Sequence, residues 1–300
     1  MNIREEILSN VSKIVIKIGT RVLTNGDGLL DKNRIMGLSK QVVDLRLRGF
    51  SVVLVSSGSI GAGISALGLQ KRPGILPELQ AAAAIGQGKL IEIYNKCFEK
   101  HGYHAAQLLL TRQDFEDRQR YLNTCNTLHS LLNFKTIPII NENDTISVDE
   151  ITFGDNDILS ALVTNLLQAD LLILLSSVDG LYTTPPTSGK RCRVLSVVDS
   201  ISDDIKKLAF KQKTKEGVGG MESKFEAANI ATGSGEAVII ANGMQSGILS
   251  KIMNYDDVGT LFVPCNKKIT SRKRWIGFTV KPKGRVYIDE GALGALQKKG

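Results

Sequence analysis

Short apolar segments alternate with longer helical segments along most of the chain. We predict strands over the apolar segments, at 13–18, 51–55, 105–110, 137–140, 171–175, 237–241 and 260–263, with an extra hairpin after Ser147. The segments between them are amphipathic or alanine-rich and predict helices, at 32–48, 59–67, 77–100, 117–133, 156–168, 202–210, 221–233 and 246–253. This alternation predicts an α/β fold of three layers, in which helices cover both faces of a mostly parallel central sheet.

A glycine-rich segment opens one of the predicted helices. Its sequence is GVGGMESK, at 217–224, so Lys224 lies in the first helical turn. Glycines let backbone N–H groups approach an anion closely, the helix start adds partial positive charge, and the lysine adds a full charge. The segment lacks the Gly-Lys-Ser or Gly-Lys-Thr of a Walker A loop, and a flexible turn before a surface helix is the alternative interpretation. A second loop of similar design, described next, favours an anion site.

Lys17 is the only charged residue in the apolar segment IVIKIGT at 14–20. An unpaired buried ammonium is costly, so this lysine indicates that the strand ends at a solvated or anion-filled cleft. Alternatively, its stem lies along the core and its head reaches water. The apolar segment 52–55 likewise runs into a small-residue loop, SSGSIGAG at 56–63. Ligands bind at such loops after the carboxyl ends of parallel strands, and the glycine order here is not the Gly-x-Gly-x-x-Gly of dinucleotide enzymes.

Two loops are rich in acidic and amide side chains. The sequence NEND at 141–144 follows a predicted strand, and GDND at 154–157 opens the predicted helix at 156–168. Asp and Asn are favoured at helix starts, which explains any single one of them. Seven such residues in two loops exceed the needs of capping. They can receive an ammonium group, hold Mg²⁺ through water, or orient the lysines.

The composition favours a cytoplasmic enzyme with one large core. The 300 residues are 42% apolar, and no apolar run approaches the roughly 20 residues that cross a membrane. The start, MNIREE, is predicted to be a charged helix and has no apolar signal-peptide region. The four cysteines are scattered without a Cys-x-x-Cys motif, which favours free thiols in a reducing compartment.

Eight segments of the chain resemble the glutamate 5-kinases of the amino acid kinase family. They occur in family order over roughly residues 11–280: VIKIGT, VLVSSGSIGAG, LLLTRQDFEDRQRYLN, IPIINENDTI, FGDNDILSALV, VDGLYT, GGMESK and SRKRWIGF. The resemblance implies the amino acid kinase fold and ATP-dependent phosphorylation of the γ-carboxylate of L-glutamate to L-glutamyl 5-phosphate, the first step of proline biosynthesis. It also implies Mg²⁺, a homodimer or homotetramer, and proline as a feedback inhibitor.

Two alternatives remain beside this interpretation. Acetylglutamate kinase, carbamate kinase, aspartokinase and bacterial UMP kinase share the fold and the two lysines, but they do not resemble this chain in NENDTI, TRQDFEDR or GDNDILSAL. The alternative within the fold is a kinase for another amino acid, such as N-acetylglutamate. The alternative outside this class is an RNA-binding or regulatory protein that keeps an inactive kinase fold, and its only support is a basic tail.

The resemblance assigns roles to individual residues. It places Lys17 against the transferring phosphoryl group, Lys224 against the leaving side, and Asp157 between the lysines as their holder. The glutamate-binding positions that it implies are Ser57, Gly58, Asp144 and Asn156. The ATP-binding positions that it implies are Lys17, Gly19, Ser176, Ser177, Val218, Gly219, Gly220, Met221, Glu222, Ser223 and Lys224. Gly19, Gly58 and Gly220 are expected to offer backbone N–H groups. No direct protein ligand is assigned to Mg²⁺, which is expected to be held by phosphate oxygens and water.

The expected chemistry needs positive charge rather than a base. A γ-carboxylate is already ionised at pH 7, so no general base is required, and catalysis comes from positioning and preorganised cations.

Two departures from the family lie on the nucleotide side. Ser176-Ser177 stands where Thr-Asp is common, and Val218 stands where a hydroxyl residue is usual. Both bear on donor preference and ATP affinity.

The basic residues are concentrated in a short tail. Residues 267–300 hold ten Lys or Arg and two acidic residues, a net charge of +8 that equals the formal charge of the whole chain. We therefore predict a kinase domain at 1–266 and a basic linker with a short tail at 267–300, in which 285–296 resembles the first strand and helix of a PUA domain.

This tail is too short to bury a core of its own. It is also too apolar for a solvated arm, with Trp275, Ile276, Phe278, Val280, Val286, Tyr287, Ile288 and Leu293. We expect the tail to be ordered against protein surface within a homo-oligomer. Its charge attracts polyanions in a salt-dependent way, but we expect no specific RNA binding.

Overall fold

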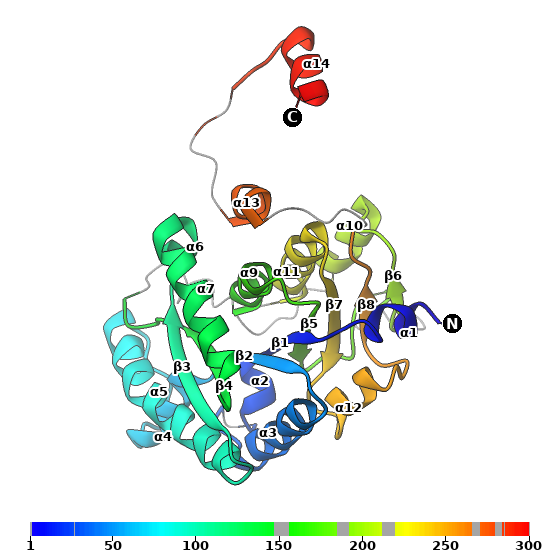
Figure 1. Cartoon of the computed structure of the whole chain (residues 1–300). Helices are drawn as coiled ribbons and strands as arrows, with labels where there is room; N and C mark the ends of the chain where they lie inside the picture. The colour runs from blue at the N-terminus through cyan, green and yellow to red at the C-terminus, as the bar shows by residue number, and fades with distance from the viewer. Residues whose placement is uncertain are drawn as a thin grey trace.

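The computed structural model describes residues 2–26, 28–146, 156–184, 192–211, 220–265, 271–279, 284 and 286–299. Its centre is an eight-stranded sheet with the strand order β3-β4-β2-β1-β5-β7-β8-β6 (Figure 1). The strands are β1 (Lys13–Ile18), β2 (Ser51–Ser56), β3 (His104–Leu110), β4 (Thr136–Glu142), β5 (Leu171–Ser176), β6 (Val197–Val198), β7 (Ala237–Asn242) and β8 (Thr260–Phe262). All neighbouring pairs are parallel except β7 and β8.

The seven predicted strands are confirmed, each to within two residues at its ends. Strand β6 was not predicted, because a two-residue strand leaves no periodic pattern. The predicted hairpin after Ser147 falls outside the described residues. Register pairs Ile18 of β1 with Ser56 of β2 and with Leu175 of β5. The carboxyl ends of these strands therefore meet at one edge of the sheet, where parallel α/β folds bind ligands.

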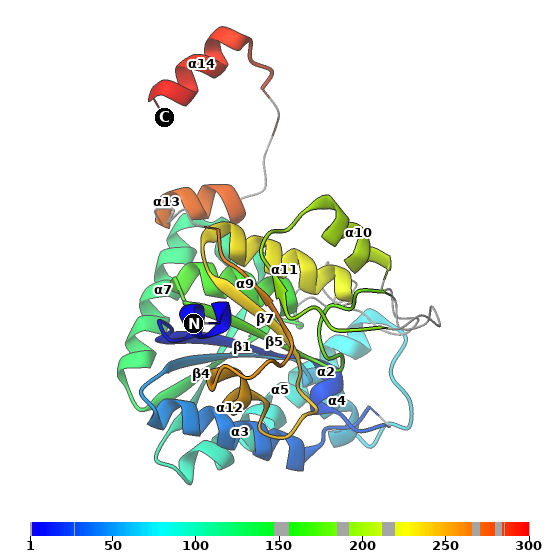
Figure 2. The same ribbon diagram turned by 90° about the vertical axis from the view of Figure 1, so that its right-hand side faces the viewer.

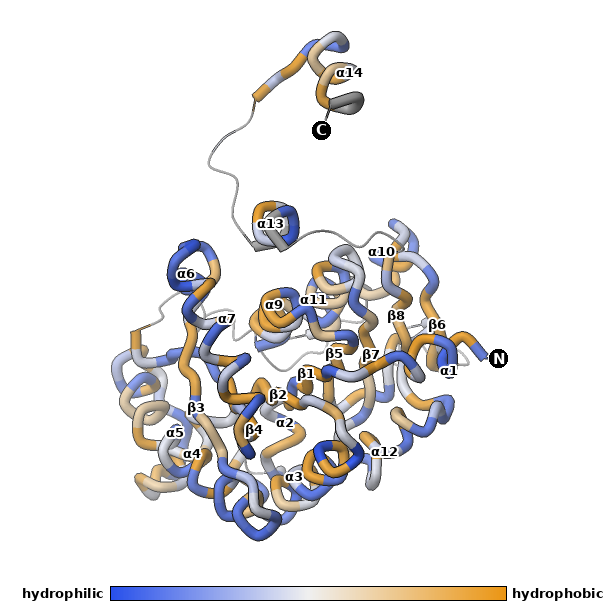
Figure 3. The backbone as a smooth tube through the Cα atoms, in the orientation of Figure 1, coloured by the Kyte–Doolittle hydropathy of each residue, from blue (hydrophilic) through white to orange (hydrophobic). Residues whose placement is uncertain are grey.

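Two helical layers cover the sheet. One layer contains α3 (Lys32–Leu47), α5 (Leu76–Glu99) and α12 (Ile248–Met253), and the other contains α7 (Arg118–Asn133), α9 (Asn156–Leu167) and α11 (Met221–Ser234) (Figure 1). The strands show nearly continuous apolar colour between the layers, as expected for a sheet buried on both faces (Figure 3). Ile14, Ile16 and Ile18 face the α3 layer, whereas Val15 faces the α9 layer. Strand alternation therefore directs Lys17 toward α9 and α11.

Short helices that the sequence did not predict separately surround the carboxyl edge. The helix α2 (Thr20–Leu23) follows β1 directly, and α6 (Arg112–Glu116) begins at a capping box formed by Thr111 and Asp114. The N-terminal helix α1 (Ile3–Leu8) was predicted, as were α4 (Ser59–Ala66) and α10 (Asp203–Lys211). No helix within the described ranges is long and apolar enough to cross a membrane.

Helices α4 and α5 touch through their backbones at two glycines. A Cβ atom at Gly63 would lie 1.8 Å from the carbonyl oxygen of Ala82, and one at Gly86 would lie 1.8 Å from the carbonyl oxygen of Ser59. Only glycine permits this approach. The contact holds the start of α4, and the loop before it, against α5.

Gly86→Ala is therefore expected to destabilise the protein by about 1–3 kcal/mol or more, since the added methyl group must push two backbones apart. Urea unfolding measures the change. Gly88→Ala is the matched control, because a Cβ at Gly88 meets no described residue within 4 Å, and alanine favours the helix. Equal stability of Gly86→Ala and the wild type would show that the helices separate freely.

The first part of the basic tail packs on the kinase body. The Nε1 atom of Trp275 donates to the carbonyl oxygen of Phe115 at 2.8 Å, the guanidinium of Arg118 lies 5.3 Å from the Trp275 ring centroid, and Arg274 pairs with Glu236. These contacts involve α13 (Ser271–Arg274) and the π-helical turn η2 (Trp275–Thr279). This much of the tail is ordered against protein surface, as predicted.

The later part of the tail lies away from the body. Helix α14 (Glu290–Lys299) stands apart from the sheet and its covering helices in two perpendicular views (Figures 1 and 2). Val286 and Tyr287, just before it, are 88% and 92% exposed in the single chain. Packing of this part within a homo-oligomer stays a prediction.

The four cysteines, all within the described ranges, are free thiols as predicted.

Candidate active site

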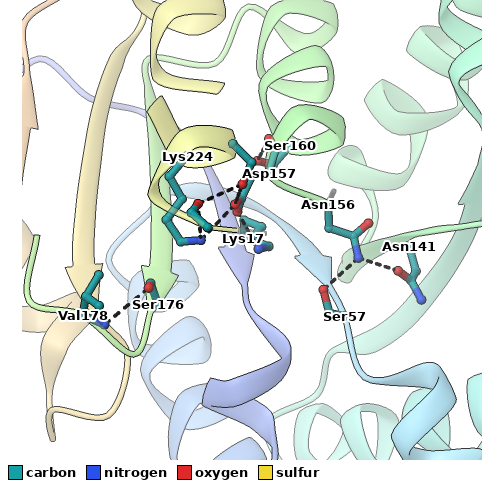
Figure 4. A network of polar contacts seen from close by, with 11 residues as sticks. Lys17, Ser57, Asn141, Asn156, Asp157, Ser160, Ser176, Val178 and Lys224 are labelled. Atoms are coloured by element: carbon teal, nitrogen blue, oxygen red, sulfur yellow. Dashed lines mark hydrogen bonds and ion pairs between the residues drawn. The ribbon is translucent and has the colours of Figure 1, made fainter. Parts of the chain in front are cut away.

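Three charged side chains meet at the carboxyl edge of the sheet (Figure 4). Lys17 is the last residue but one of β1, Asp157 lies in the first turn of α9, and Lys224 lies in the first turn of α11. Lys17 Nζ lies 2.5 Å from Asp157 Oδ1, and Lys224 Nζ lies 3.1 Å from Asp157 Oδ2. The structure thus joins the two lysines that the sequence placed at opposite ends of the chain, and it joins them through the predicted aspartate.

Asp157 is fully buried and stays ionised. Burial by itself would raise the pKa of this carboxyl, but Lys17 and Lys224, with hydrogen bonds from Lys17 and Ser223, hold it well below its usual range. Ser223 Oγ donates to Asp157 Oδ2 at 2.8 Å. Both lysines are themselves almost buried, at 6% and 7% exposure. The cluster therefore carries a net positive charge in a poorly solvated place, where an approaching anion is strongly attracted.

Gly220 begins α11 and adjoins this cluster. Its carbonyl oxygen accepts from Ser223 Oγ at 3.1 Å and from Lys224 Nζ at 3.4 Å. Among the described residues, a Cβ at Gly220 would meet only the backbone nitrogen of Glu222, at 4.0 Å. The predicted positions Val218 and Gly219 lie outside the described residues.

Gly19 differs from its predicted role as a free N–H donor. Its N–H donates to the carbonyl oxygen of Leu175 at 3.1 Å, because the pairing of β1 with β5 continues one residue past Ile18. A Cβ at Gly19 would lie 3.7 Å from Lys17 Nζ. The glycine therefore leaves room beside the lysine head while its amide belongs to the sheet.

The other predicted nucleotide positions occupy varied surroundings. Ser176 is buried, and its Oγ accepts weakly from the Val178 N–H at 3.4 Å, while Ser177 is exposed. Met221 is buried in the core between the sheet and the α9 layer, and Glu222 is exposed. Their roles toward a nucleotide stay predictions.

A cavity of about 870 Å³ is lined by Asn156, the residue next to Asp157 of the lysine cluster. Its lining includes all four predicted glutamate positions, Ser57, Gly58, Asp144 and Asn156. The start of α4 shapes one wall, because Gly58 has a left-handed φ of 105° that L side chains rarely adopt. Ser59 Oγ donates to Asp144 Oδ2 at 2.7 Å and joins this wall to the acidic loop.

The cavity carries charges of both signs. Glu142 and Asp144 supply carboxylates, while Arg21, Lys71 and Arg72 supply cations that the sequence did not single out. Such a lining suits a ligand that has both an ammonium and carboxylate groups. The volume also falls in the range of small-molecule sites, roughly 300–1,000 Å³.

Buried amides connect the cavity wall to α5. Asn156 Nδ2 donates to Ser57 Oγ at 2.8 Å and to Asn141 Oδ1 at 2.9 Å (Figure 4). Asn141 Nδ2 donates in turn to Gln87 Oε1 at 2.9 Å. Asn156 and Asp157 are neighbours in the first turn of α9, so one helix start serves both the cavity and the lysine cluster.

Comparison with known proteins identifies the family. The model of the amino acid kinase family matches residues 12–242. The glutamate 5-kinase of Thermoanaerobacter sp. (strain X514) is 49% identical over 96% of this chain and 77% of its own length. That of Syntrophus aciditrophicus (strain SB) is 46% identical over 99% of this chain and 77% of its own. The chain belongs to the amino acid kinase family.

Solved structures of this family share the fold. Carbamate kinase from Giardia lamblia bound to AMP-PNP aligns with a TM-score of 0.57 at 19% identity, covering 86% of this chain and all of that one. UMP kinase from Bacillus anthracis aligns with a TM-score of 0.53 at 12% identity, covering 84% of this chain and 96% of that one. At these identities the likeness concerns the fold alone, and it confirms the predicted amino acid kinase architecture.

Sequence reasoning missed several residues of this kinase family site. Gln87, Arg21, Lys71 and Arg72 belong to no motif with a spacing of its own, and Ser59 lies in the SSGSIGAG loop but was not singled out. Gln87 could have been noticed only as a polar residue on the buried side of a helix, beside Gly86. Its partner Asn141 lies 54 residues away, and local sequence carries no sign of that contact.

Proposed function

We propose that the chain catalyses ATP-dependent phosphorylation of the γ-carboxylate of L-glutamate, giving L-glutamyl 5-phosphate for proline biosynthesis. Relatives named glutamate 5-kinase, at 44–49% identity over nearly the whole chain, support this assignment. The observation that carries it is the position of the Lys17–Asp157–Lys224 cluster directly beside a cavity of mixed charge. Phosphoryl transfer to a carboxylate needs both features side by side.

The lysines act on the charge of the reaction. The glutamate carboxylate is already an anion, so the obstacle is its repulsion from a triphosphate, followed by charge on the transferring group. Lys17 lies on β1 beside β2, which leads to Ser57 in the cavity lining, and it neutralises the transferring phosphoryl group. Lys224, at the start of α11, neutralises the leaving side. Asp157 fixes both ammonium groups, which keeps them preorganised and avoids reorganisation during transfer.

The cavity recognises the polar ends of glutamate. Asp144 and Glu142 attract the ammonium group, and the cations of the lining attract the carboxylates. Ser57 and Asn156 stand between these charges and the lysine cluster, where the reacting carboxylate must lie. N-acetylglutamate lacks the ammonium charge and fits this lining less well, which favours free glutamate as the acceptor.

The described residues are compatible with a Mg²⁺ ion that is held by the phosphates of ATP and by water. Within the described ranges, no group of three His, Cys, Asp or Glu side chains converges on a possible metal position. Asp157 is committed to the two lysines. Mg²⁺ commonly keeps several waters and binds substrate phosphates, and it would supply additional neutralisation of phosphate charge.

The proposal extends to assembly and regulation. The family resemblance supports a homodimer or homotetramer, inhibition by proline, and a kinase domain over 1–266 followed by a basic tail. The exposed Val286 and Tyr287 support burial of the tail against another protein surface.

Hydroxamate formation tests the reaction itself. With ATP, Mg²⁺, glutamate and hydroxylamine, the acyl phosphate is trapped as a coloured hydroxamate, and its yield should depend on each component. N-acetylglutamate in place of glutamate is the control substrate. Turnover of N-acetylglutamate without turnover of glutamate would overturn the assignment.

Asn156→Ala and Asp144→Ala are expected to raise the glutamate KM by roughly 10- to 100-fold, because each removes a hydrogen bond to a charged group. The ATP KM should change much less. Initial-rate kinetics with each substrate varied separately measures both constants. Asn123→Ala, on the exposed side of α7, is the control and should match the wild type. Loss of ATP affinity with unchanged glutamate affinity would mean that the two halves of the site are exchanged.

A further inference from the structure

Gln87 is a buried polar residue with no role in the mechanism above. It lies on α5, is 7% exposed, and follows the glycine at which α5 touches α4. Its Oε1 atom accepts from Asn141 Nδ2 at 2.9 Å. Asn141, on β4, is 1% exposed and lines the cavity. A buried contact between two amides is specific, since each has a donor end and an acceptor end.

The Glu142 N–H and Gln87 Oε1 together fix the orientation of these amides, one at each end of the Asn141 side chain. The N–H of Glu142 donates to the side chain of Asn141 at 2.9 Å, and a backbone N–H can only donate, so this end of Asn141 is the oxygen. The NH₂ end of Asn141 must then face an acceptor, which is Gln87 Oε1. The same Asn141 oxygen requires a donor from Asn156, so the Asn156 NH₂ group points toward Asn141 and Ser57.

This order determines what Ser57 offers to the cavity. A hydroxyl has one hydrogen to donate and two lone pairs that accept. Because the Asn156 NH₂ group donates to Ser57 Oγ, the Ser57 hydrogen is directed elsewhere. Ser57 is half-buried and lines the cavity, so this hydrogen can be donated to a bound anion.

We propose that Gln87 is a positioning residue for the acceptor: through Asn141 and Asn156 it orients the Ser57 hydroxyl to donate to a carboxylate oxygen of the substrate. The proposal rests on the function proposed above. A buried amide on α5 then acts on substrate recognition without touching the substrate. Reversing the Asn156 amide would turn the Ser57 hydrogen toward Asn156 and leave a lone pair facing the carboxylate.

Gln87→Met tests the relay, since methionine keeps the size and shape of glutamine and is only a weak acceptor. We expect the glutamate KM to rise about tenfold, the effect of one hydrogen bond, with the ATP KM unchanged. Gln87→Glu keeps an acceptor oxygen for Asn141 and should restore the glutamate KM to within about threefold of the wild type. Gln41→Met is the matched control: Gln41 Oε1 accepts from the Leu249 N–H at 3.0 Å, far from the cavity, and its loss should leave both KM values unchanged.

A double-mutant cycle with Ser57→Ala separates the relay from a general loosening of the site. If Gln87 acts through Ser57, Gln87→Met should change the glutamate KM less than about twofold in the Ser57→Ala background. A tenfold effect in both backgrounds, or a wild-type KM for Gln87→Met alone, overturns the inference and leaves the proposed function intact. Absence of glutamate turnover by the wild type overturns both.

Discussion

Lys17→Ala and Lys224→Ala are each expected to lower kcat by roughly 10²–10³ or more, the loss typical of a preorganised electrostatic donor. Each lysine lies close to Asp157, at 2.5 Å and 3.1 Å, so each variant leaves the aspartate with one cationic partner. Folding should therefore remain largely intact. Saturating hydroxamate assays measure kcat, and circular dichroism checks the fold.

Lys13→Ala is the matched control for this prediction. Lys13 lies on the same strand, four residues earlier, and its Nζ atom donates to the carbonyl oxygen of Leu167 instead of facing the cluster. It should keep nearly wild-type kcat. Wild-type turnover by either Lys17→Ala or Lys224→Ala would refute the role assigned to that lysine.

Asp157→Asn is expected to destabilise the protein by about 3–5 kcal/mol, because it leaves two nearly buried ammonium groups without their shared anion. Urea unfolding measures this change. ATP should recover part of the loss, since its phosphates replace the missing negative charge and ligand binding stabilises the folded state. An unchanged unfolding free energy would show that water already solvates the two ammonium groups in the folded protein.

Asp204→Asn is the matched control for Asp157→Asn. Asp204 pairs with Lys207 at 3.8 Å on the surface of α10, where its side chain is 94% exposed. Exposed pairs contribute little to stability, so this variant should unfold like the wild type.

The stability difference between the wild type and Asp157→Asn is expected to depend on pH. Burial opposes ionisation of Asp157, but the two lysines and the hydrogen bonds from Lys17 and Ser223 lower its pKa in the folded protein. Because the pKa is lower in the folded protein, the ionised carboxylate stabilises the fold. This stabilisation is fully present above the pKa of the unfolded chain, about 3.9, and is lost as the pH falls toward the pKa of the folded protein. The difference should therefore be constant from pH 5 to neutrality and shrink below about pH 4. A constant difference throughout would contradict this linkage.

The sequence alone predicted the layers and seven of the eight strands of the described sheet, and it named candidate site residues whose roles stay predictions. Strand β1 could be predicted because residues 14–18 are apolar except for Lys17, and the position of that charge indicated where the strand meets a ligand. The loops around Ser57 and Gly220 could be predicted because small residues followed by helical periodicity are local patterns. The roles of Asp144 and Asn156 came from resemblance, since Asp and Asn at a helix start have an equally good explanation in capping.

Other features exist only between segments that are distant in the chain. Lys17 and Lys224 are brought together by Asp157, and their separation in sequence gives no indication of distance in space. The Gly19 amide was wrongly expected to be free, because the continuation of β1 pairing with β5 depends on a strand more than 150 residues away. The contact of Gln87 with Asn141 and the packing of Trp275 on Phe115 are equally non-local.

The sequence by itself thus determined which segments become strands and helices, because periodicity and glycine placement act over a few residues. Only the tertiary structure decided that one aspartate holds both lysines and that a glutamine on α5 bonds to an amide of the cavity. The physical reason is that hydrogen bonds and ion pairs depend on distances of about 3 Å, which are set by packing of the whole sheet and its helices.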